Sequence, residues 1–240
     1  QAPYYLTISD IYFQLSKPKK SKNALLKAAE LEPEFTEPLY RLAQFELYLG
    51  NHQKCIDYAN DMLRTDVRDD RPFMVKGLCY KDLGDTTKAI QNYLEAVTEN
   101  PDNYDAYVEL GILHWGRKDP LTEGYLKSAL DIQPDGIDAL YALGMQYQET
   151  YRLNDALEAY TEILTIDSSY TAAYYNMGYI QYQYLQLYNE ALANFNKAVQ
   201  INPKYYQAVY MRGLCFEAKG DVPKATQEYR YALELHPGYK

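Results

Sequence analysis

DRPFMVKGLCYKDLGDTTKAIQNYLEAVTENPDN, residues 70–103, has the pattern of two short helices joined by a tight turn. Gly77 costs about 1 kcal/mol of helix propensity relative to alanine, which is tolerable where a second helix has to approach closely. Gly84 suits the left-handed position that ends a helix. Tyr93 lies on one stripe of the second helix with small alanines on either side of it. Pro101 cannot continue a helix, so the stretch predicts a helix–turn–helix unit that ends there.

The same spacing recurs from one end of the chain to the other. If the first residue of each copy is place 1, small residues recur at place 8, apolar or aromatic residues at place 24 and, in most copies, proline at place 32. One such hairpin cannot bury its own apolar face, whereas stacked copies can. The sequence therefore predicts an all-α chain with one continuous core over residues 1–240. The predicted copies are 2–35, 36–69, 70–103, 104–136, 137–170, 171–205 and 206–239.

These residues make the chain resemble the tetratricopeptide repeat (TPR) family, whose helix–turn–helix unit has about 34 residues. The resemblance covers essentially the whole chain. It implies a right-handed α–α superhelical solenoid of antiparallel helix pairs, organised as a single domain. It also implies a scaffold that binds a protein or peptide ligand and catalyses no reaction.

Three copies depart from the pattern. In copies two and four, Glu46 and His114 occupy place 11, where an aromatic side chain is usual, and we expect His114 to fill the core there. Copy six is one residue long, and the extra residue falls in QYLQLYN, residues 183–189. No glycine ends the first helix of that copy, so we expect this helix to extend.

Composition excludes some classes of protein. The formal net charge is -9, which argues against a nucleic-acid binder because such a protein needs a basic stripe. No run of about 18 apolar residues occurs, so the sequence predicts no transmembrane segment. The chain begins at Gln1 without a methionine, as a mature or an excised form would. A cytoplasmic location and a bacterial periplasmic or lipid-anchored location both stay open.

The sequence shows no constellation of catalytic residues. His52, His114 and His236 belong to different copies, and neither HExxH nor CxxC occurs. Acidic pairs are abundant, as they are on any acidic helical surface. The sequence therefore predicts no enzyme, no cofactor and no metal site.

The three cysteines occupy places that usually hold small residues. Cys55 is at place 20 of its copy, and Cys79 and Cys215 are each at place 10. All three are predicted to be buried as small hydrophobic side chains. Cys79 and Cys215 lie four copies apart, too far for a disulfide bond.

A local basic cluster stands out against the acidic chain. The segment SKPKKSK, residues 16–22, is predicted to be the hairpin loop of copy one. One interpretation is a solvated loop. The other is a contact with an anionic partner, such as a membrane surface near an anchored N-terminus.

The resemblance also indicates where a ligand binds, because the first helices of TPR pairs line a concave groove. Places 2, 5, 6, 9, 12 and 13 point into that groove. Here places 5, 9 and 12 carry mainly aromatic, aliphatic and methionine side chains, where a solvated helix would show Lys or Glu. Tyr and Trp are frequent anchors of binding hot spots. The groove residues that we predict are Tyr40, Met74, Trp115, Tyr141, Met145, Tyr175, Asn176, Tyr179, Tyr182 and Tyr210.

The alternative is that neighbouring copies pack so tightly that places 5 and 9 touch one another and close the groove. Tyr179 and Tyr182 are the hardest residues to hide in that way. Under this alternative the chain is a self-associating or spacer module of a larger or membrane-anchored assembly. The last predicted helix, about residues 222–235, is then expected to expose Tyr231 and Leu233 or to use them in a homo-oligomer contact.

Overall fold

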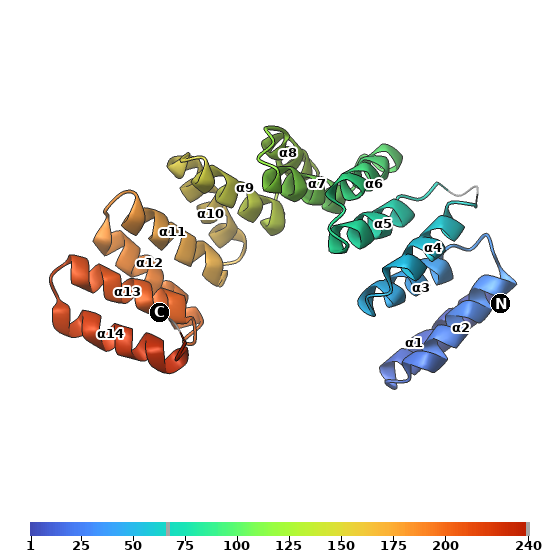
Figure 1. Ribbon diagram of the computed structural model, residues 1–240, viewed down its shortest axis with the longest axis horizontal. Coiled ribbons are helices and arrows are strands. Elements are labelled where there is room, and N and C mark those ends of the chain that lie inside the picture. Colours follow the sequence, from blue (N-terminus) through green and yellow to red (C-terminus); the bar gives the residue numbers. More distant parts are fainter. Residues whose placement is uncertain (66–67, 239–240) are drawn as a thin grey trace. The chain divides into compact units, whose positions relative to one another are not determined.

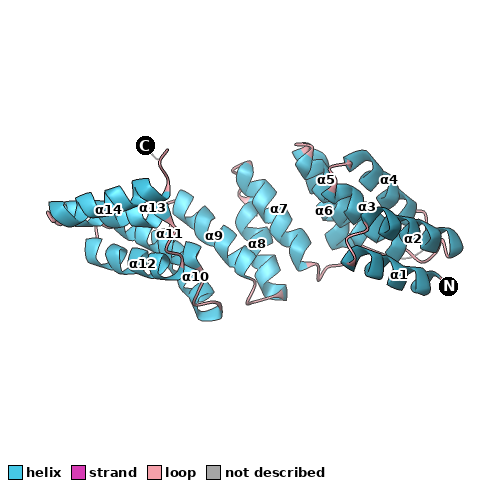
Figure 2. Cartoon of the chain, turned by 90° about the horizontal axis from the view of Figure 1, so that it is seen from below, coloured by secondary structure: helices cyan, strands magenta, loops and turns pink. Residues whose placement is uncertain are grey.

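The computed structural model describes residues 1–65 and 68–238, and in these ranges the chain forms fourteen α-helices joined by short loops (Figures 1 and 2). Consecutive helices form antiparallel pairs, and each predicted copy contains one pair. The fold is therefore all-α, as predicted. The helices are α1 (Ala2–Gln14), α2 (Pro18–Leu31), α3 (Glu37–Tyr48), α4 (His52–Met62), α5 (Arg71–Asp82), α6 (Thr86–Glu99), α7 (Tyr104–Gly116), α8 (Leu121–Ile132), α9 (Ile137–Glu149), α10 (Leu153–Ile166), α11 (Thr171–Gln183), α12 (Tyr188–Ile201), α13 (Tyr206–Ala218) and α14 (Val222–Leu235).

Contacts divide the chain into two compact units, Gln1–Ile132 and Gln133–Lys240. Unit 1 holds α1 to α8, and unit 2 holds α9 to α14. Within each unit, every helix packs against its partner in the pair, and the second helix of each pair but the last packs against the first helix of the next pair. One solenoid running through both units stays a prediction.

Small residues at place 8 let the two helices of a pair approach closely. A methyl group added at Gly77 of α5 would lie 2.6 Å from Cε1 of Tyr93 on α6, so only a residue without Cβ fits there. The turn between these helices ends at Gly84, whose φ of +76° is strained for any other residue. Asp85 then caps α6 by accepting a hydrogen bond from the backbone N–H of Lys88 at 3.1 Å. Local sequence thus determines the hairpin, as predicted.

Two expectations about loops were wrong. In copy six the first helix, α11, ends at Gln183 and does not extend. The extra residue is taken up in the loop, where Gln186 adopts a φ of +56° and Leu187 N–H donates to the carbonyl of Gln181 at 2.8 Å. A left-handed residue other than glycine therefore reverses the chain there.

The basic segment of copy one is mostly helix and not loop, because α2 begins at Pro18. Proline is favoured in the first turn, where its missing N–H has no helical partner to lose. Lys22 reaches from α2 to the buried carboxylate of Glu46 on α3 and forms an ion pair with it. One member of the predicted loop cluster is thus paired with a buried carboxylate.

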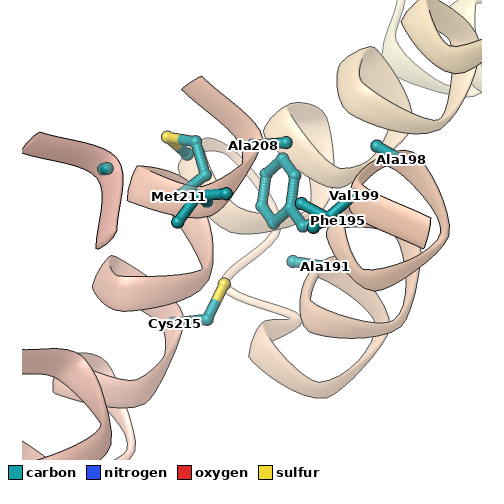
Figure 3. Close-up of a cluster of buried hydrophobic side chains, with 9 residues drawn as sticks. Ala191, Phe195, Ala198, Val199, Ala208, Met211 and Cys215 are labelled. Carbon is teal, nitrogen blue, oxygen red and sulfur yellow. The ribbon is translucent and has the colours of Figure 1, made fainter. Parts of the chain in front are cut away.

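The core of unit 2 is built from facing positions on its second and first helices (Figure 3). Phe195 on α12 is fully buried, and its ring lies against the backbone of Gly178 on α11. Small residues on α12 and α13 fill the space around it, which brings helices of consecutive pairs together. The buried cluster is Ala191, Phe195, Ala198, Val199, Ala208, Val209, Met211, Cys215 and Ala232.

Candidate functional site

The predicted groove residues fall into two groups, one in each unit. Seven lie on the first helices of unit 2, and this set is named the first-helix face of unit 2. Its members are Tyr141 and Met145 on α9, Tyr175, Asn176, Tyr179 and Tyr182 on α11, and Tyr210 on α13. The other three, Tyr40, Met74 and Trp115, belong to α3, α5 and α7 of unit 1.

Helix α11 is the centre of this face, and it is unusual in composition. Its thirteen residues, TAAYYNMGYIQYQ, include no charged side chain. In the structure α11 lies beside α13 (Figure 1). Its tyrosines at 174, 175, 179 and 182 are all partly exposed. A helix that shows aromatic rings instead of charges to solvent is a surface suited to a partner.

The place-5 tyrosines pack their inner faces onto aromatic rings of the second helices. The ring centroid of Tyr141 is 6.0 Å from that of Tyr160, and Tyr210 is 5.4 Å from Tyr229. In the intervening copy, Tyr175 contacts Phe195 at 5.8 Å. Such aromatic pairs contribute about 0.5–1.5 kcal/mol beyond their area burial. Each place-5 ring therefore packs one side against the core and leaves the other side partly exposed.

The side chain of Asn176 forms hydrogen bonds within the chain. Its side chain is 8% exposed, and its amide donates to the hydroxyl of Tyr141 at 3.2 Å and to the sulfur of Met145 at 3.5 Å. These bonds tie α11 to α9. The structure thus gives Asn176 a positioning role for two other members of the face.

Tyr179 and Tyr182 are partly buried and contact neighbouring tyrosines. Tyr179 is stacked on Tyr175 with centroids 6.5 Å apart, and it meets Tyr184 edge-on at 6.2 Å. Tyr182 contacts Tyr188 of α12 at 5.6 Å. Partial burial raises the pKa of Tyr182 above its usual value, so its hydroxyl stays protonated and can donate a hydrogen bond.

The three predicted residues of unit 1 have different surroundings. Tyr40 lies under the guanidinium of Arg71 at 4.9 Å from the ring centroid, and its hydroxyl accepts from Gln44 at 2.8 Å. Met74 packs against the buried cluster that contains Tyr93. Trp115 on α7 is half-buried. They therefore form no aromatic run like that of α11.

A cleft of about 1130 Å³ in unit 1 was not anticipated from the sequence. Phe13 of α1 and Tyr48 of α3 line this cleft, and 68% and 89% of their surface is exposed. One feature of the sequence could have indicated this cleft. Leu25 is at place 24, where later copies mostly carry Tyr or Phe, and its smaller side chain leaves space beside it. The lining residues are Ser9, Asp10, Phe13, Ser16, Pro18, Lys19, Ser21, Lys22, Leu25, Arg41, Gln44, Phe45, Tyr48 and Leu49.

The last helix exposes the two residues predicted for it. Tyr231 and Leu233 of α14 have 37% and 48% of their surface accessible. The hydroxyl of Tyr231 donates to the carbonyl of Pro203 at 3.2 Å, while Leu233 presents an apolar side chain. Their exposure agrees with the prediction, and their use in an oligomer contact stays a prediction.

The histidines have separate surroundings. His114 is buried, its ring centroid lies 5.1 Å from that of Tyr125 and its Nδ1 lies 3.1 Å from Asp119, so it fills the core as predicted. His52 lies 3.4 Å from Asp82, and His236 stacks on Tyr206. In residues 1–65 and 68–238, no three His, Cys, Asp or Glu side chains gather as metal ligands would. No helix in the same ranges has the length and apolarity to cross a bilayer.

Family models match three parts of the chain. One described as "TPR repeat" matches residues 77–116, and two described as "Tetratricopeptide repeat" match residues 2–35 and 180–240. These regions lie near the beginning, in the middle and at the end of the sequence.

Similar proteins include the human protein O-mannosyl-transferase TMTC3, 23% identical over 97% of this chain and 26% of that protein. The TPR repeat-containing protein MJ1428 of Methanocaldococcus jannaschii is 27% identical over 66% of this chain and 29% of that protein. The chain thus spans little more than a quarter of the length of these relatives.

Solved structures share the fold. The C-terminal part of a TPR repeat-containing protein from Cytophaga hutchinsonii aligns over 98% of this chain and 96% of its own, with a TM-score of 0.77 and 16% identity. YrrB, described as a TPR protein with an unusual peptide-binding site, aligns over 78% of this chain and 96% of its own, with a TM-score of 0.61 and 22% identity.

Proposed function

Because the chain is a tetratricopeptide-repeat protein, we propose that it is a non-enzymatic scaffold whose first-helix face in unit 2 binds an apolar or aromatic peptide segment. The repeat is generically a protein-interaction module and is typically non-catalytic, although some relatives are parts of enzymes. The observation that carries the proposal is the uncharged helix α11 with its four half-exposed tyrosines.

The stacking of the tyrosines supports the same proposal. Rings held from beneath, as Tyr175 is held by Phe195, lose little conformational freedom when a ligand covers their outer faces. Rigid aromatic side chains are common anchors in binding sites for this reason. YrrB provides a precedent in a similar fold, since it is described as having a peptide-binding site.

Energetics favour a ligand that touches more than one helix pair. One buried apolar anchor contributes about 1.5–3 kcal/mol. Micromolar binding needs about 8 kcal/mol, and ordering the ligand costs several more. A single anchor is insufficient, so the proposed ligand is an extended or helical segment that contacts several of the first helices of unit 2.

The test is a selection of peptides from a displayed random library, followed by affinity measurement with a selected peptide. The double variant Tyr179→Ala/Tyr182→Ala removes two partly exposed rings of this face. We expect selected peptides to be rich in apolar and aromatic residues, and the double variant to weaken binding by at least about tenfold, or 1.4 kcal/mol. Fluorescence anisotropy of a labelled peptide measures this loss, and far-UV circular dichroism confirms that the variant is folded.

Tyr48→Ala is the matched control, because Tyr48 is an exposed tyrosine at the cleft of unit 1. Binding that survives the double variant and is lost with Tyr48→Ala would place the ligand in that cleft and refute the proposal. Selected peptides dominated by charged residues would also contradict it.

A second candidate function, self-association, is favoured by the apolar surface of α14. We expect Leu233→Lys to abolish any rise of molecular mass with protein concentration in sedimentation experiments, because a charge would have to be buried in the contact. Leu94→Lys, at a position of similar exposure on α6, is the control and should leave the mass unchanged. A constant monomer mass in the wild type would refute self-association.

A further inference from the structure

Two of the three cysteines lie side by side in the core of unit 1. Cys55 on α4 and Cys79 on α5 are both fully buried, and their sulfur atoms are 2.7 Å apart in a thiol–thiol hydrogen bond. They belong to one buried cluster with Ala43, Ile56, Ala59 and Val75. This pair was not predicted from the sequence. Cys79, at place 10 of copy three, contacts Cys55, at place 20 of copy two.

The equivalent position in unit 2 shows that packing alone does not require two cysteines. Cys215 is at place 10 of its copy, and Ala191, the place-20 equivalent of Cys55, lies in the same buried cluster (Figure 3). Alanine therefore satisfies the fold where Cys55 stands in unit 1. A second thiol at this contact permits disulfide chemistry, which an alanine does not.

We propose that Cys55 and Cys79 are the site of a reversible disulfide bond, which joins the second helix of copy two to the first helix of copy three. A disulfide bond is about 2.0 Å long, so forming it shortens the present sulfur–sulfur contact by less than 1 Å. The two helices already pack against each other. The bond therefore needs only a small further approach of the two sulfur atoms.

The oxidant is a small-molecule disulfide of the glutathione type, and the reaction is thiol–disulfide exchange. One protein thiolate attacks the small disulfide, which forms a mixed disulfide and releases one small thiol. The second protein thiolate then attacks the protein sulfur of the mixed disulfide and displaces the other small thiol. Two protein thiols lose two electrons and two protons, and the one small disulfide becomes two small thiols.

In the packed state the hydrogen bond between the sulfurs lowers the pKa of Cys79 and raises that of Cys55. Burial raises the pKa of Cys215 to about 12, and this thiol has no cysteine beside it in its cluster. Because both paired thiols are fully buried, exchange takes place when α4 and α5 separate transiently or while the protein refolds.

The test uses the whole chain in buffers of reduced and oxidised glutathione, both in the native state and after refolding from urea. Free thiols are then blocked with N-ethylmaleimide under denaturing conditions, and the intact mass is measured. We expect three blocked thiols in the reduced protein and one, on Cys215, in the oxidised protein. A proteolytic peptide that links Cys55 to Cys79 identifies the bond, and the oxidised protein should have a higher unfolding midpoint because a cross-link restricts the unfolded chain.

Cys55→Ala reproduces the natural pair at Ala191 and Cys215, so we expect it to fold and to form no internal disulfide. Ala191→Cys should create a second pair that oxidises together with Cys215. Three blocked thiols after refolding with excess oxidised glutathione would overturn the proposal. So would stable glutathione adducts on Cys55 or Cys79, or a cross-link that involves Cys215 in the wild type.

Discussion

Glu46 shows how one residue can break the repeat pattern and still be accommodated. Four other copies carry Tyr or Phe at its place, but this carboxylate is fully buried in unit 1. Lys22 of α2 forms an ion pair with it, and Asn51 donates a hydrogen bond at 2.8 Å. Burial by itself would raise the pKa of Glu46, but the bonds from Lys22 and Asn51 outweigh it and the pKa is lowered from 4.5.

This lowered pKa makes the stability of the protein depend on pH. A carboxyl group whose pKa is lower in the folded state stabilises the fold above its unfolded pKa of about 4.5 and loses that contribution as pH falls through the folded value. We expect Glu46→Gln to lower stability at pH 7 by about 1–3 kcal/mol, because Lys22 loses its charged partner. The difference between wild type and variant should shrink as the pH falls below about 4.5.

Thermal unfolding followed by circular dichroism between about pH 3 and 7 measures that difference. Glu30→Gln is the control, because Glu30 pairs with Lys27 on the exposed surface, where such pairs contribute little. A pH-independent difference for Glu46→Gln would show that the carboxylate charge has no role.

At the scale of the helix pair, the contact between place 8 and place 24 holds the two helices together. A methyl group on Gly144 would lie 2.6 Å from Cε1 of Tyr160, and Gly178 and Phe195 stand in the same relation. The aromatic ring of the second helix thus covers the backbone of the first. This arrangement explains why glycine, a poor helix former, recurs in the middle of these helices.

We expect Gly144→Ala to destabilise the protein even though alanine favours helix. The gain in helix propensity is about 1 kcal/mol, whereas forcing a methyl group into a packed contact costs about 1–3 kcal/mol and displaces the ring of Tyr160. Gly124→Ala in α8 is the matched control, since no atom lies within 4 Å of the added methyl group. Urea denaturation should show a lower midpoint for Gly144→Ala and an equal or higher midpoint for Gly124→Ala, and the reverse order would contradict this account.

At the scale of the whole molecule, each unit has its own buried clusters. Unit 2 contains three helix pairs and a cluster contributed by α12, α13 and α14. In repeat proteins, stability is approximately a sum over the repeats and their nearest-neighbour contacts. Such arrays need at least about three repeats to be stable. The three pairs of unit 2 meet this requirement, and a single pair does not.

We therefore expect residues 133–240 expressed alone to be helical and to unfold in a cooperative transition. Residues 206–240, a single pair, should show little helix because the hairpin cannot bury its apolar face by itself. Circular dichroism with urea titration of both fragments measures this. A helical single pair, or an unfolded three-pair fragment, would mean that stability in this chain is not distributed over neighbouring repeats.

The helices, their pairing and the close contacts inside each pair follow from local patterns in the amino-acid sequence. Gly77 faces Tyr93, Gly84 ends its helix and α14 exposes Leu233 because helical periodicity and backbone preferences act over a few residues. The contacts between pairs arise only in the folded chain. The tertiary structure brought Lys22 to Glu46, brought Cys55 to Cys79, opened the cleft beside Phe13, and showed how much of each tyrosine on α11 stays uncovered. These contacts depend on how closely neighbouring pairs pack, and many side chains set that distance together rather than any local pattern.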